Sequence, residues 1–422
     1  MKLDIKPYKG TRDIYPEDMR LRRYIFNTWR EVVESYGYEE YDAPVLEPFE
    51  LYAAKTGEEI VNDQTYTFVD RGERKVAIRP EMTPSVGRMI AARRQEQAYP
   101  ARLYSIANFM RYEKPQKGRE REFWQLNVDI FGVESIEADI EVIAIGAEIL
   151  KRFGAKPEMY SIKVNDRRLI NFVMSDFFEL NYEKVTQMMK LFDRKNKISK
   201  DEFENQAIEI AGKGKLTQIQ EVMEAKTIED LPKEILDSGK LNDIQTVVKK
   251  LKEKNVFAEF DITLMRGFDY YTGIVFEVFD KNPNNNRSMF GGGRYDGLVG
   301  LFGVDDLPVF GFAPGETTTI EFLKTWNLIP ELNPSTDLVL VEMIDGAQII
   351  ATKLRGLGVK VAEDFTGRKL DKVIKSADRN GVKWILFVGK DEMERETYKL
   401  KNLESGENLE LNISEIAQTV LK

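Results

Sequence analysis

The chain has 422 residues, of which 42% are hydrophobic and 32% charged, and its formal net charge is −9 at pH 7. This length predicts two or three domains, and the composition excludes collagen-like and disordered proteins. The sequence contains no Cys and no His. The chain therefore has no disulfide, no thiolate or imidazole catalyst and no Cys or His metal ligand, which excludes most proteases. Carboxylates, Lys, Arg and hydroxyls remain, and they suit chemistry on phosphate groups with an oxygen-ligated ion such as Mg²⁺.

The amino-terminal sequence MKLDIKPYKG carries charges where a signal peptide has an apolar segment. No stretch of the sequence approaches the ~18 apolar residues of a membrane span. We therefore expect a soluble, cytoplasmic protein with no membrane partner.

Helices flank a run of strand-like segments in the first part of the chain. Apolar residues at three- and four-residue spacing from Leu21 to Tyr36 predict a helix that ends at Gly37, and a second helix is expected from Ile140 to Phe153. The strand-like segments between them are APVLEP, YTFVD, KVAIRP, ARLYSIANFM and EFWQLNVDIFG. Strands at hairpin-like spacing between helices favour an antiparallel sheet in an α+β domain.

A Lys- and Glu-rich stretch with helical spacing, from about Tyr182 to Val256, predicts an inserted helical module. Strand signals then return in LMRGFDYYTGIVFEVF and PVFGFAPG. We expect one domain over residues 1–330 that is interrupted by a helical insertion at about 170–255.

The linker NLIPELNPSTD carries two prolines and marks the last domain boundary. Beyond it, the apolar segments DLVLVEM and WILFVG alternate with helical patterns around 349–357 and 370–377. Alternating strands and helices predict a small α/β domain over residues 336–422.

Residues 111–121 form the richest segment, with five cations, two acidic residues and a local balance of +3. In the strand that follows, period-two alternation places Trp124, Leu126, Val128 and Ile130 on an apolar face. Gln125, Asn127 and Asp129 share the opposite face. Beside a cationic loop, this polar row is a plausible floor for a zwitterionic substrate next to a polyphosphate. Taken alone, the pattern favours a solvated hairpin with a polar outer face, which is ordinary in antiparallel sheets.

Several segments, in this order, resemble the class II histidyl-tRNA synthetases. RYEKPQKGREREFWQLNVDIFG resembles motif 2 of the family, and GTRDIYPED with YGYEEYDAPVLEP resembles its amino-terminal strand and motif 1. IRPEMT is similar to an element of the amino-acid pocket, and LMRGFDYYTG and GGGRYDGL resemble the two histidine-specific motifs. FTGRKLDKVIKSADRNGVKWILFVGKDE resembles the anticodon-binding domain. The resemblance implies an α+β fold: an antiparallel-sheet catalytic domain with a helical insertion, plus a C-terminal α/β anticodon-binding-type domain.

The same resemblance implies that histidine and ATP, with Mg²⁺, give histidyl-adenylate, which then charges tRNA-His in a homodimer with Pro44 at the interface. The residues that it implies for histidine binding are Glu81, Met82, Thr83, Arg111, Gln125, Asp129, Arg266, Tyr270 and Tyr271. Those implied for ATP are Arg111, Glu113, Arg119 and Phe123, and those for tRNA are Lys114, Gln116, Lys369, Lys372 and Arg379. Arg266 and Arg111 would be catalytic, since fixed guanidinium groups stabilise charge at phosphorus without a titrating base. The resemblance leaves the residues that would hold a metal ion unassigned.

Ordinary structural interpretations stand beside these roles. Arg79 and Glu81 could form a surface ion pair, and Tyr270 and Tyr271 could be ordinary sheet aromatics. Gly291–Gly293 could form a tight turn.

The sequence departs from the family at three places, one of which is Lys114, where bacterial members often have an arginine that meets the extra 5′ nucleotide of tRNA-His. Asp129 stands where the family usually has glutamate, and the Glu-Arg pair of motif 3, expected after Gly315, falls at Thr317 and Thr318. An ATP-binding arginine is therefore missing. This favours an alternative, a catalytically silent paralogue that resembles the regulatory subunit of ATP phosphoribosyltransferase. The C-terminal domain and the motif around Arg266 argue against that alternative.

The last domain carries a basic half. From Lys353 to Lys383 there are nine cations and four acidic residues, a balance of +5. Helical spacing places Leu370, Val373, Ile374 and Ala377 on a buried face and Lys369, Lys372, Lys375 and Arg379 away from it. This surface is the expected contact for RNA, although a Lys-rich helix face is often merely solvated.

Overall fold

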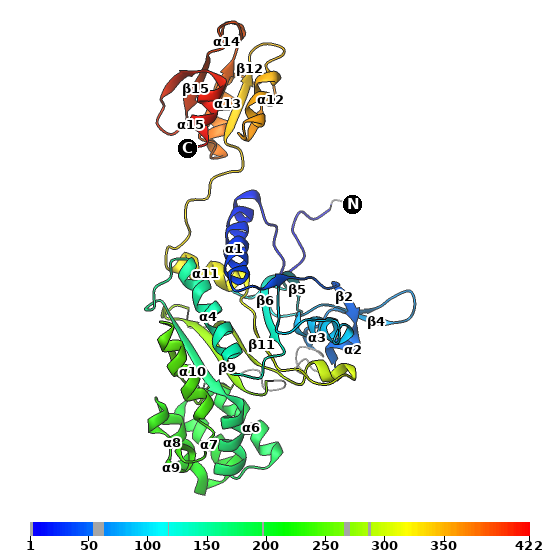
Figure 1. The fold of residues 1–422 in the computed structure, drawn as a ribbon, viewed down its shortest axis with the longest axis vertical. Helices are drawn as coiled ribbons and strands as arrows, with labels where there is room; N and C mark the ends of the chain where they lie inside the picture. The colour runs from blue at the N-terminus through cyan, green and yellow to red at the C-terminus, as the bar shows by residue number, and fades with distance from the viewer. Residues whose placement is uncertain (1–2, 54–62, 117, 196–197, 266–270, 286–287) are drawn as a thin grey trace. The chain divides into compact units, whose positions relative to one another are not determined.

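The computed structural model describes residues 3–53, 63–116, 118–195, 198–265, 271–285 and 288–422. The chain divides into two compact units, Met1–Asp13 with Arg22–Ile329 and Ile14–Leu21 with Pro330–Lys422. Figure 1 shows the helices and strands of both units and labels many of them.

An eight-stranded sheet is the frame of the first unit, with strand order β1-β5-β6-β11-β10-β9-β7-β8. Neighbouring strands are antiparallel through the middle of the sheet, and only the pairs at its two ends, β1–β5 and β7–β8, are parallel. In sheet order the strands are β1 (Glu39–Glu40), β5 (Ala101–Met110), β6 (Glu122–Phe131), β11 (Val309–Phe312), β10 (Ser288–Arg294), β9 (Ile274–Asp280), β7 (Tyr160–Asp166) and β8 (Ala258–Phe260). The predicted antiparallel-sheet α+β fold is confirmed.

Three helices pack on or beside this sheet. α4 (Glu137–Arg152) contacts β6 and β11, and α11 (Glu316–Thr325) contacts β6 and β10. α1 (Pro16–Ser35) places the ring of Phe26 5.4 Å from that of Trp124 on β6. α1 starts at Pro16, earlier than the apolar pattern predicts. Proline suits the first position of a helix, where its missing N–H group costs no hydrogen bond, and the two acidic residues that follow interact favourably with the helix dipole.

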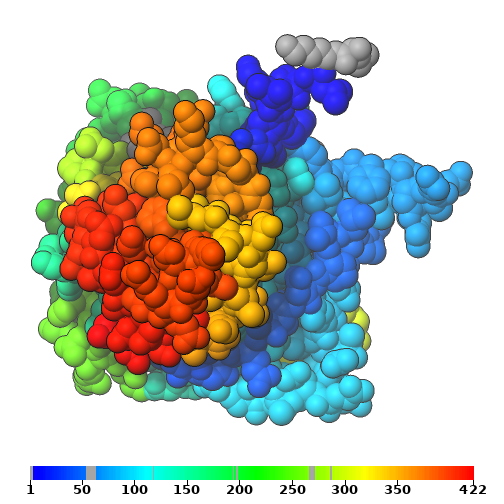
Figure 2. All heavy atoms as spheres, turned by 90° about the horizontal axis from the view of Figure 1, so that it is seen from above, coloured from blue at the N-terminus to red at the C-terminus, as the bar shows by residue number. Residues whose placement is uncertain are grey.

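A smaller sheet of three strands lies next to the cavity described below. In sheet order its strands are β2 (Leu46–Pro48), β4 (Lys75–Ile78) and β3 (Thr67–Val69). Helix α2 (Phe49–Ala53) follows β2 in the chain, and α3 (Thr83–Ala92) follows β4. The β3–β4 hairpin, in light blue, extends from the rest of its unit in both Figure 1 and Figure 2. The side chains of Leu46 and Phe68 are exposed on one face of this sheet, and those of Val45 and Val69, next to them in the sequence, are exposed as well.

Helices occupy the chain between β7 and β8. They are α5 (Arg167–Phe172), the π-helical turn η2 (Val173–Phe177), α6 (Tyr182–Asp193), α7 (Lys200–Ala211), α8 (Leu216–Glu224), α9 (Lys233–Leu236) and α10 (Asn242–Glu253). Side-chain caps start three of them. Asp166 accepts a hydrogen bond from the N–H of Arg168 at α5, Asn181 one from that of Lys184 at α6, and Ser199 one from that of Glu202 at α7. α10 packs against β7 and α4, so the helical segment rests on the edge of the main sheet.

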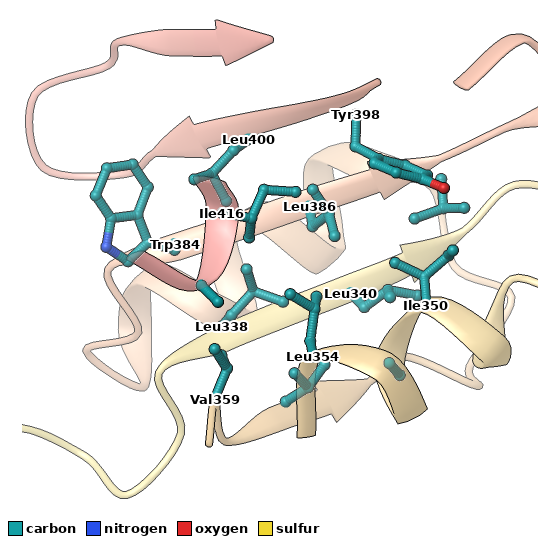
Figure 3. Packing of buried hydrophobic residues seen from close by; sticks show 14 of the residues in the cluster. Leu338, Leu340, Ile350, Leu354, Val359, Trp384, Leu386, Tyr398, Leu400 and Ile416 are labelled. Carbon is teal, nitrogen blue, oxygen red and sulfur yellow. The ribbon is translucent and has the colours of Figure 1, made fainter. Parts of the chain in front are cut away.

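The second unit is a small α/β domain with the sheet order β13-β12-β14-β15-β16. Its elements are β12 (Leu338–Glu342), α12 (Gln348–Gly356), β13 (Val361–Glu363), α13 (Leu370–Arg379), β14 (Trp384–Val388), α14 (Lys390–Arg395), β15 (Tyr398–Asn402), β16 (Asn408–Leu411) and α15 (Ile413–Val420). Figure 3 shows the main core, where Leu338, Leu340 and Leu386 of the sheet meet Leu354 and Ile416 of two helices. The sequence did not predict the β15–β16 hairpin. Leu370, expected on the buried face of α13, is 39% exposed because it begins the helix beyond the core.

Candidate active site

A cavity of about 440 Å³ opens over the middle of the main sheet. This volume is in the range of pockets for small ligands. Of the residues predicted to bind histidine or ATP, those that line it are Glu81, Thr83, Arg111, Glu113, Arg119, Phe123, Gln125, Asp129 and Tyr271. These residues come from the start of α3, the connection between β5 and β6, strand β6 itself and the segment just before β9. The fold therefore brings together segments up to 190 residues apart in the sequence.

The polar face of β6 is the floor of the cavity. Gln125, Asn127 and Asp129 all line it, and Asn127 and Asp129 are 5% and 4% exposed. The solvated-hairpin interpretation of this strand is therefore wrong. Both faces of β6 are covered, because α4 and α11 pack on the sheet and other segments close over the polar side.

Asp129 is held by a tyrosine from the end of β10. The hydroxyl of Tyr295 donates a hydrogen bond to Oδ1 of Asp129. Burial raises the pKa of Asp129 to about 7, and the hydrogen bond from Tyr295 opposes this rise. Gly311 lies opposite Asp129 in register, and a Cβ at that position would overlap both Asp129 and Tyr295. A glycine on β11 is therefore required for the carboxyl group and the phenol to meet.

Arginines and a glutamate line another part of the cavity. The Nε of Arg111 donates to the carbonyl oxygen of Pro80 at 2.9 Å, and its guanidinium lies 5.2 Å from the ring centre of Phe123. Glu113 Oε2 lies 3.2 Å from Arg119 Nη1, and Glu113 Oε1 lies 4.0 Å from Arg111 Nη1. The carboxylate between them keeps the two guanidinium groups oriented at the cavity.

A glycine-rich strand forms another wall. Gly291–Gly293 lie within β10 and not in a tight turn, so that interpretation is wrong. A Cβ on Gly291 would stand 2.7 Å from the carbonyl oxygen of Phe276 on β9, so the absence of a side chain lets these strands pair and leaves the cavity open.

The two threonines after Gly315 line the cavity, but their hydroxyls are engaged within the chain. Thr318 Oγ1 lies 3.0 Å from the carbonyl oxygens of both Met289 and Gly315, and Thr317 Oγ1 lies 3.4 Å from Glu120 Oε2. Neither hydroxyl takes the place of a guanidinium.

Arg12, which the sequence analysis did not single out, contacts Glu120, a residue that lines this part of the cavity. Its Nε lies 2.9 Å from Glu120 Oε1, and its Nη2 lies 3.6 Å from Glu316 Oε1. Burial raises the pKa of Glu120, and the charge and hydrogen bond of Arg12 act against that rise. Glu316 is also held by Arg22 through two contacts of 2.8 Å. The amino-terminal segment thus compensates Glu120, which lines the cavity, and the buried Glu316. In the sequence, this role of the segment was indicated only by the presence of Arg12 in GTRDIYPED.

The remaining predicted residues lie elsewhere. Met82 is fully buried in a hydrophobic cluster with Ala43, Ala107 and Phe109, and it does not line the cavity. Arg79 is also buried, where it donates to the carbonyl oxygens of Ala43 and Asn108 and forms an ion pair with Asp42 at 3.0 Å.

Two groups of predicted residues lie outside the cavity or outside the described chain. Lys114 and Gln116 are exposed beside the cavity, and the exposed side chains of Lys369, Lys372 and Arg379 belong to α13 or its first flanking residue. Arg266 and Tyr270 fall outside the described residues.

The described residues contain no group of three acidic side chains that could hold a metal ion by themselves. Nor does any helix among them combine the length and the apolar character needed to cross a bilayer.

Comparison with known proteins agrees with this architecture. A family profile described as histidyl-tRNA synthetase matches residues 10–315, and one described as anticodon binding domain matches residues 334–422. The chain is 40% identical over 430 residues to the histidine–tRNA ligase of Leptospira biflexa, covering 99% of this chain and 98% of the relative.

Two solved structures show the same fold. Histidyl-tRNA synthetase from Nostoc sp. PCC 7120 superimposes with a TM-score of 0.85 at 23% identity, covering 100% of this chain and 99% of that one. A protein from Bacillus halodurans C, titled an ATP phosphoribosyltransferase regulatory subunit/histidyl-tRNA synthetase, gives 0.76 at 21% identity and covers 92% and 100%.

The sheet, its cavity and the C-terminal α/β unit are thus those of an aminoacyl-tRNA synthetase. Within that class, the chain belongs to the histidyl-tRNA synthetase family.

Proposed function

We propose that this protein is a histidine–tRNA ligase, which activates histidine with ATP and then transfers the histidyl group to tRNA-His. The observation that carries the proposal is the cavity, where a buried amide and carboxylate row on β6 lies beside Arg111 and Arg119. Such a cavity suits a zwitterionic amino acid next to a polyphosphate. Membership of the family supports the same assignment.

Histidine occupies the β6 side of the cavity in this proposal. The carboxylates of Glu81 and Asp129 take its ammonium group, and Tyr271 with Tyr270 takes its imidazole. The full set proposed for histidine is that of the sequence analysis: Glu81, Met82, Thr83, Arg111, Gln125, Asp129, Arg266, Tyr270 and Tyr271. Met82 acts through packing, because its side chain is buried away from the cavity.

ATP enters as its Mg²⁺ complex beside Arg111, Glu113, Arg119 and Phe123. A carboxylate oxygen of histidine attacks the α-phosphorus, the bond to the bridging oxygen breaks, and pyrophosphate leaves with the electron pair. Arg111 and Arg266 stabilise the charge that develops on the α-phosphate oxygens. Since the described residues offer no three-carboxylate site, Mg²⁺ is bound chiefly through the phosphates, as is usual for this ion.

The tRNA contacts both units. Lys114 and Gln116 meet its acceptor end next to the cavity, and Lys369, Lys372 and Arg379 meet its anticodon side. We assign residues 1–330, with the insertion at about 170–255, to catalysis and residues 336–422 to anticodon binding. The protein works in the cytoplasm.

A second copy of the chain covers the exposed apolar residues of the three-stranded sheet. Leu46 and Phe68 are exposed on one face of that sheet, and Leu46 follows by two residues Pro44, the position that the family resemblance places at a dimer interface. Contiguous exposed apolar side chains of this kind mark interaction surfaces.

Histidine-dependent exchange of labelled pyrophosphate into ATP tests the proposal. Exchange at saturating histidine, ATP and Mg²⁺ is expected from the unmodified protein, followed by charging when tRNA-His is added. The regulatory alternative remains because of the two threonines after Gly315 and the fold shared with the Bacillus halodurans protein. A folded protein that binds histidine but supports no exchange would establish that alternative instead.

A further inference from the structure

Asn127 lies between two of the residues assigned to histidine. It follows Gln125 by two positions on β6 and precedes Asp129 by two, so the three side chains project from one face of the strand. Asn127 lines the cavity and is only 5% exposed to solvent. The family resemblance gives roles to its two neighbours and none to Asn127.

The amide nitrogen of Asn127 is not satisfied within the described part of the protein. Across the described chain, its Nδ2 has no hydrogen-bond partner although the atom is buried. Ser105 stands opposite Asn127 in register on β5, and its buried Oγ likewise finds no partner within the described ranges. Leaving a buried amide unpaired costs free energy that an apolar side chain of the same size would not cost.

The neighbouring acid supplies no hydrogen bond to this nitrogen, and Oδ1 of Asp129 accepts one from Tyr295 instead. A carboxamide both donates and accepts, and a half-turn of the amide group exchanges its nitrogen and oxygen. Asn127 can therefore pair with either an N–H group or a lone pair of a molecule in the cavity. Histidine offers both, through its ammonium group and its imidazole.

We propose that Asn127 is a third histidine-binding residue on β6, whose carboxamide hydrogen-bonds the amino acid and contributes to its selection. The inference rests on histidine being the substrate, as in the proposed function. A buried polar group that only the correct substrate satisfies discriminates strongly against analogues that leave it unpaired. The additional contact is consistent with the aspartate at position 129, because the Asp129 side chain is one methylene shorter than the usual glutamate and extends less far into the cavity.

The test replaces the amide by an apolar group of similar size, Asn127→Leu, and by Asn127→Ala. Histidine-dependent pyrophosphate exchange gives the KM for histidine and for ATP, and thermal unfolding is followed with and without histidine. We expect kcat/KM for histidine to fall by about tenfold or more, as for one lost substrate hydrogen bond, with the KM for ATP unchanged. Without histidine, at least one of the variants should be as stable as the unmodified protein, and its histidine-induced rise in Tm should shrink.

Ser105→Ala is the matched control. It also removes a buried polar atom that lacks a partner in the described structure, from the position opposite Asn127, but Ser105 does not line the cavity. This variant should keep the KM for histidine.

Unchanged kcat/KM for histidine and an unchanged Tm response in both Asn127 variants would overturn the proposal. So would an equal loss toward histidine and ATP that follows a loss of stability, because that pattern indicates a structural role. A failure of the ligase function itself is distinguishable, since the unmodified protein would then show no exchange. If that protein still responds to histidine in Tm, the variants decide the role of Asn127, and if it shows no response, both proposals fall.

Discussion

Tyr295 and Asp129 meet beneath the cavity although 166 residues separate them in the sequence. The Tyr295 side chain is 3% exposed, and its hydroxyl donates a hydrogen bond to the Asp129 carboxyl group. Burial raises the pKa of Asp129, and this hydrogen bond opposes the rise. The ionisation of a proposed histidine ligand therefore depends on its burial and on a hydrogen bond from a residue at another strand end. The pH dependence of histidine binding should reveal this coupling.

Tyr295→Phe removes the hydrogen bond that favours the carboxylate, so the pKa of Asp129 should rise beyond its present value of about 7. A larger fraction of Asp129 is then protonated at neutral pH, and a neutral acid attracts an ammonium group less. The acidic limb of a plot of log kcat/KM for histidine against pH should move to higher pH. Titration of free histidine is common to both proteins and cancels in the comparison. Superimposable acidic limbs would show that Tyr295 does not tune Asp129.

The ion pair between Arg22 and Glu316 should contribute to stability, because Glu316 is buried and the contact is bidentate at 2.8 Å. Arg22→Ala leaves a buried carboxylate with only the more distant Arg12. We expect a loss of about 3 kcal/mol in the free energy of unfolding, typical of breaking a buried pair. Arg30→Ala, which breaks the exposed pair with Glu40, should cost less than about 1 kcal/mol. Urea unfolding measures both, and equal losses would contradict the argument.

Arg12 should matter for ATP rather than for histidine. Arg12→Gln leaves the Glu120 carboxylate uncompensated at the cavity, where it repels a polyphosphate. The KM for ATP should rise by about three- to tenfold, an effect of roughly 1 kcal/mol, with the KM for histidine unchanged. Adding Glu120→Gln to the same protein should restore the KM for ATP. A double variant as impaired as Arg12→Gln alone would mean that Arg12 acts in another way.

Restoring a cation at Thr318 should favour ATP. Five acidic side chains (Glu81, Glu113, Glu120, Asp129, Glu277) and two arginines line the cavity in the described part of the chain. Thr318→Arg adds a guanidinium among them, and the KM for ATP should fall severalfold with kcat maintained. Thr318→Val, which removes the hydroxyl and adds no charge, is the control and should not lower the KM. A raised KM for ATP in Thr318→Arg would show that the cavity rejects the longer side chain.

Neutralising the exposed cations of α13 and its amino-terminal flank should weaken tRNA binding. In the triple variant Lys369→Gln, Lys372→Gln, Arg379→Gln, each lost phosphate contact should reduce the slope of log affinity against log salt by about 0.7–0.9. Pyrophosphate exchange should be unchanged, because the cavity belongs to the other unit. Lys390→Gln with Lys399→Gln, two cations in ion pairs of the same domain, is the control. An unchanged salt slope in the triple variant would place the RNA on a different surface.

The sequence by itself determined the features that depend on local spacing. The period of two in EFWQLNVDIFG assigned Gln125, Asn127 and Asp129 to one face of a strand, because alternation is a property of extended backbone alone. Helical spacing likewise placed Lys369, Lys372 and Arg379 on the exposed side of α13, although it misjudged Leu370 at the end of that helix. Motif order carried the family, which the comparisons confirm.

Only the tertiary structure decided what covers those faces. Alternation cannot distinguish a solvated polar face from a buried one, and the floor of the cavity is buried because segments from distant parts of the chain close over it. For the same reason, the sequence alone did not predict which residues pair with Asp129 and Glu120. Tyr295 reaches Asp129, and Arg12 reaches Glu120, only because strand pairing and the path of the amino-terminal segment bring together residues more than 100 positions apart. Such contacts depend on the packing of whole elements, and no local pattern of residues encodes them.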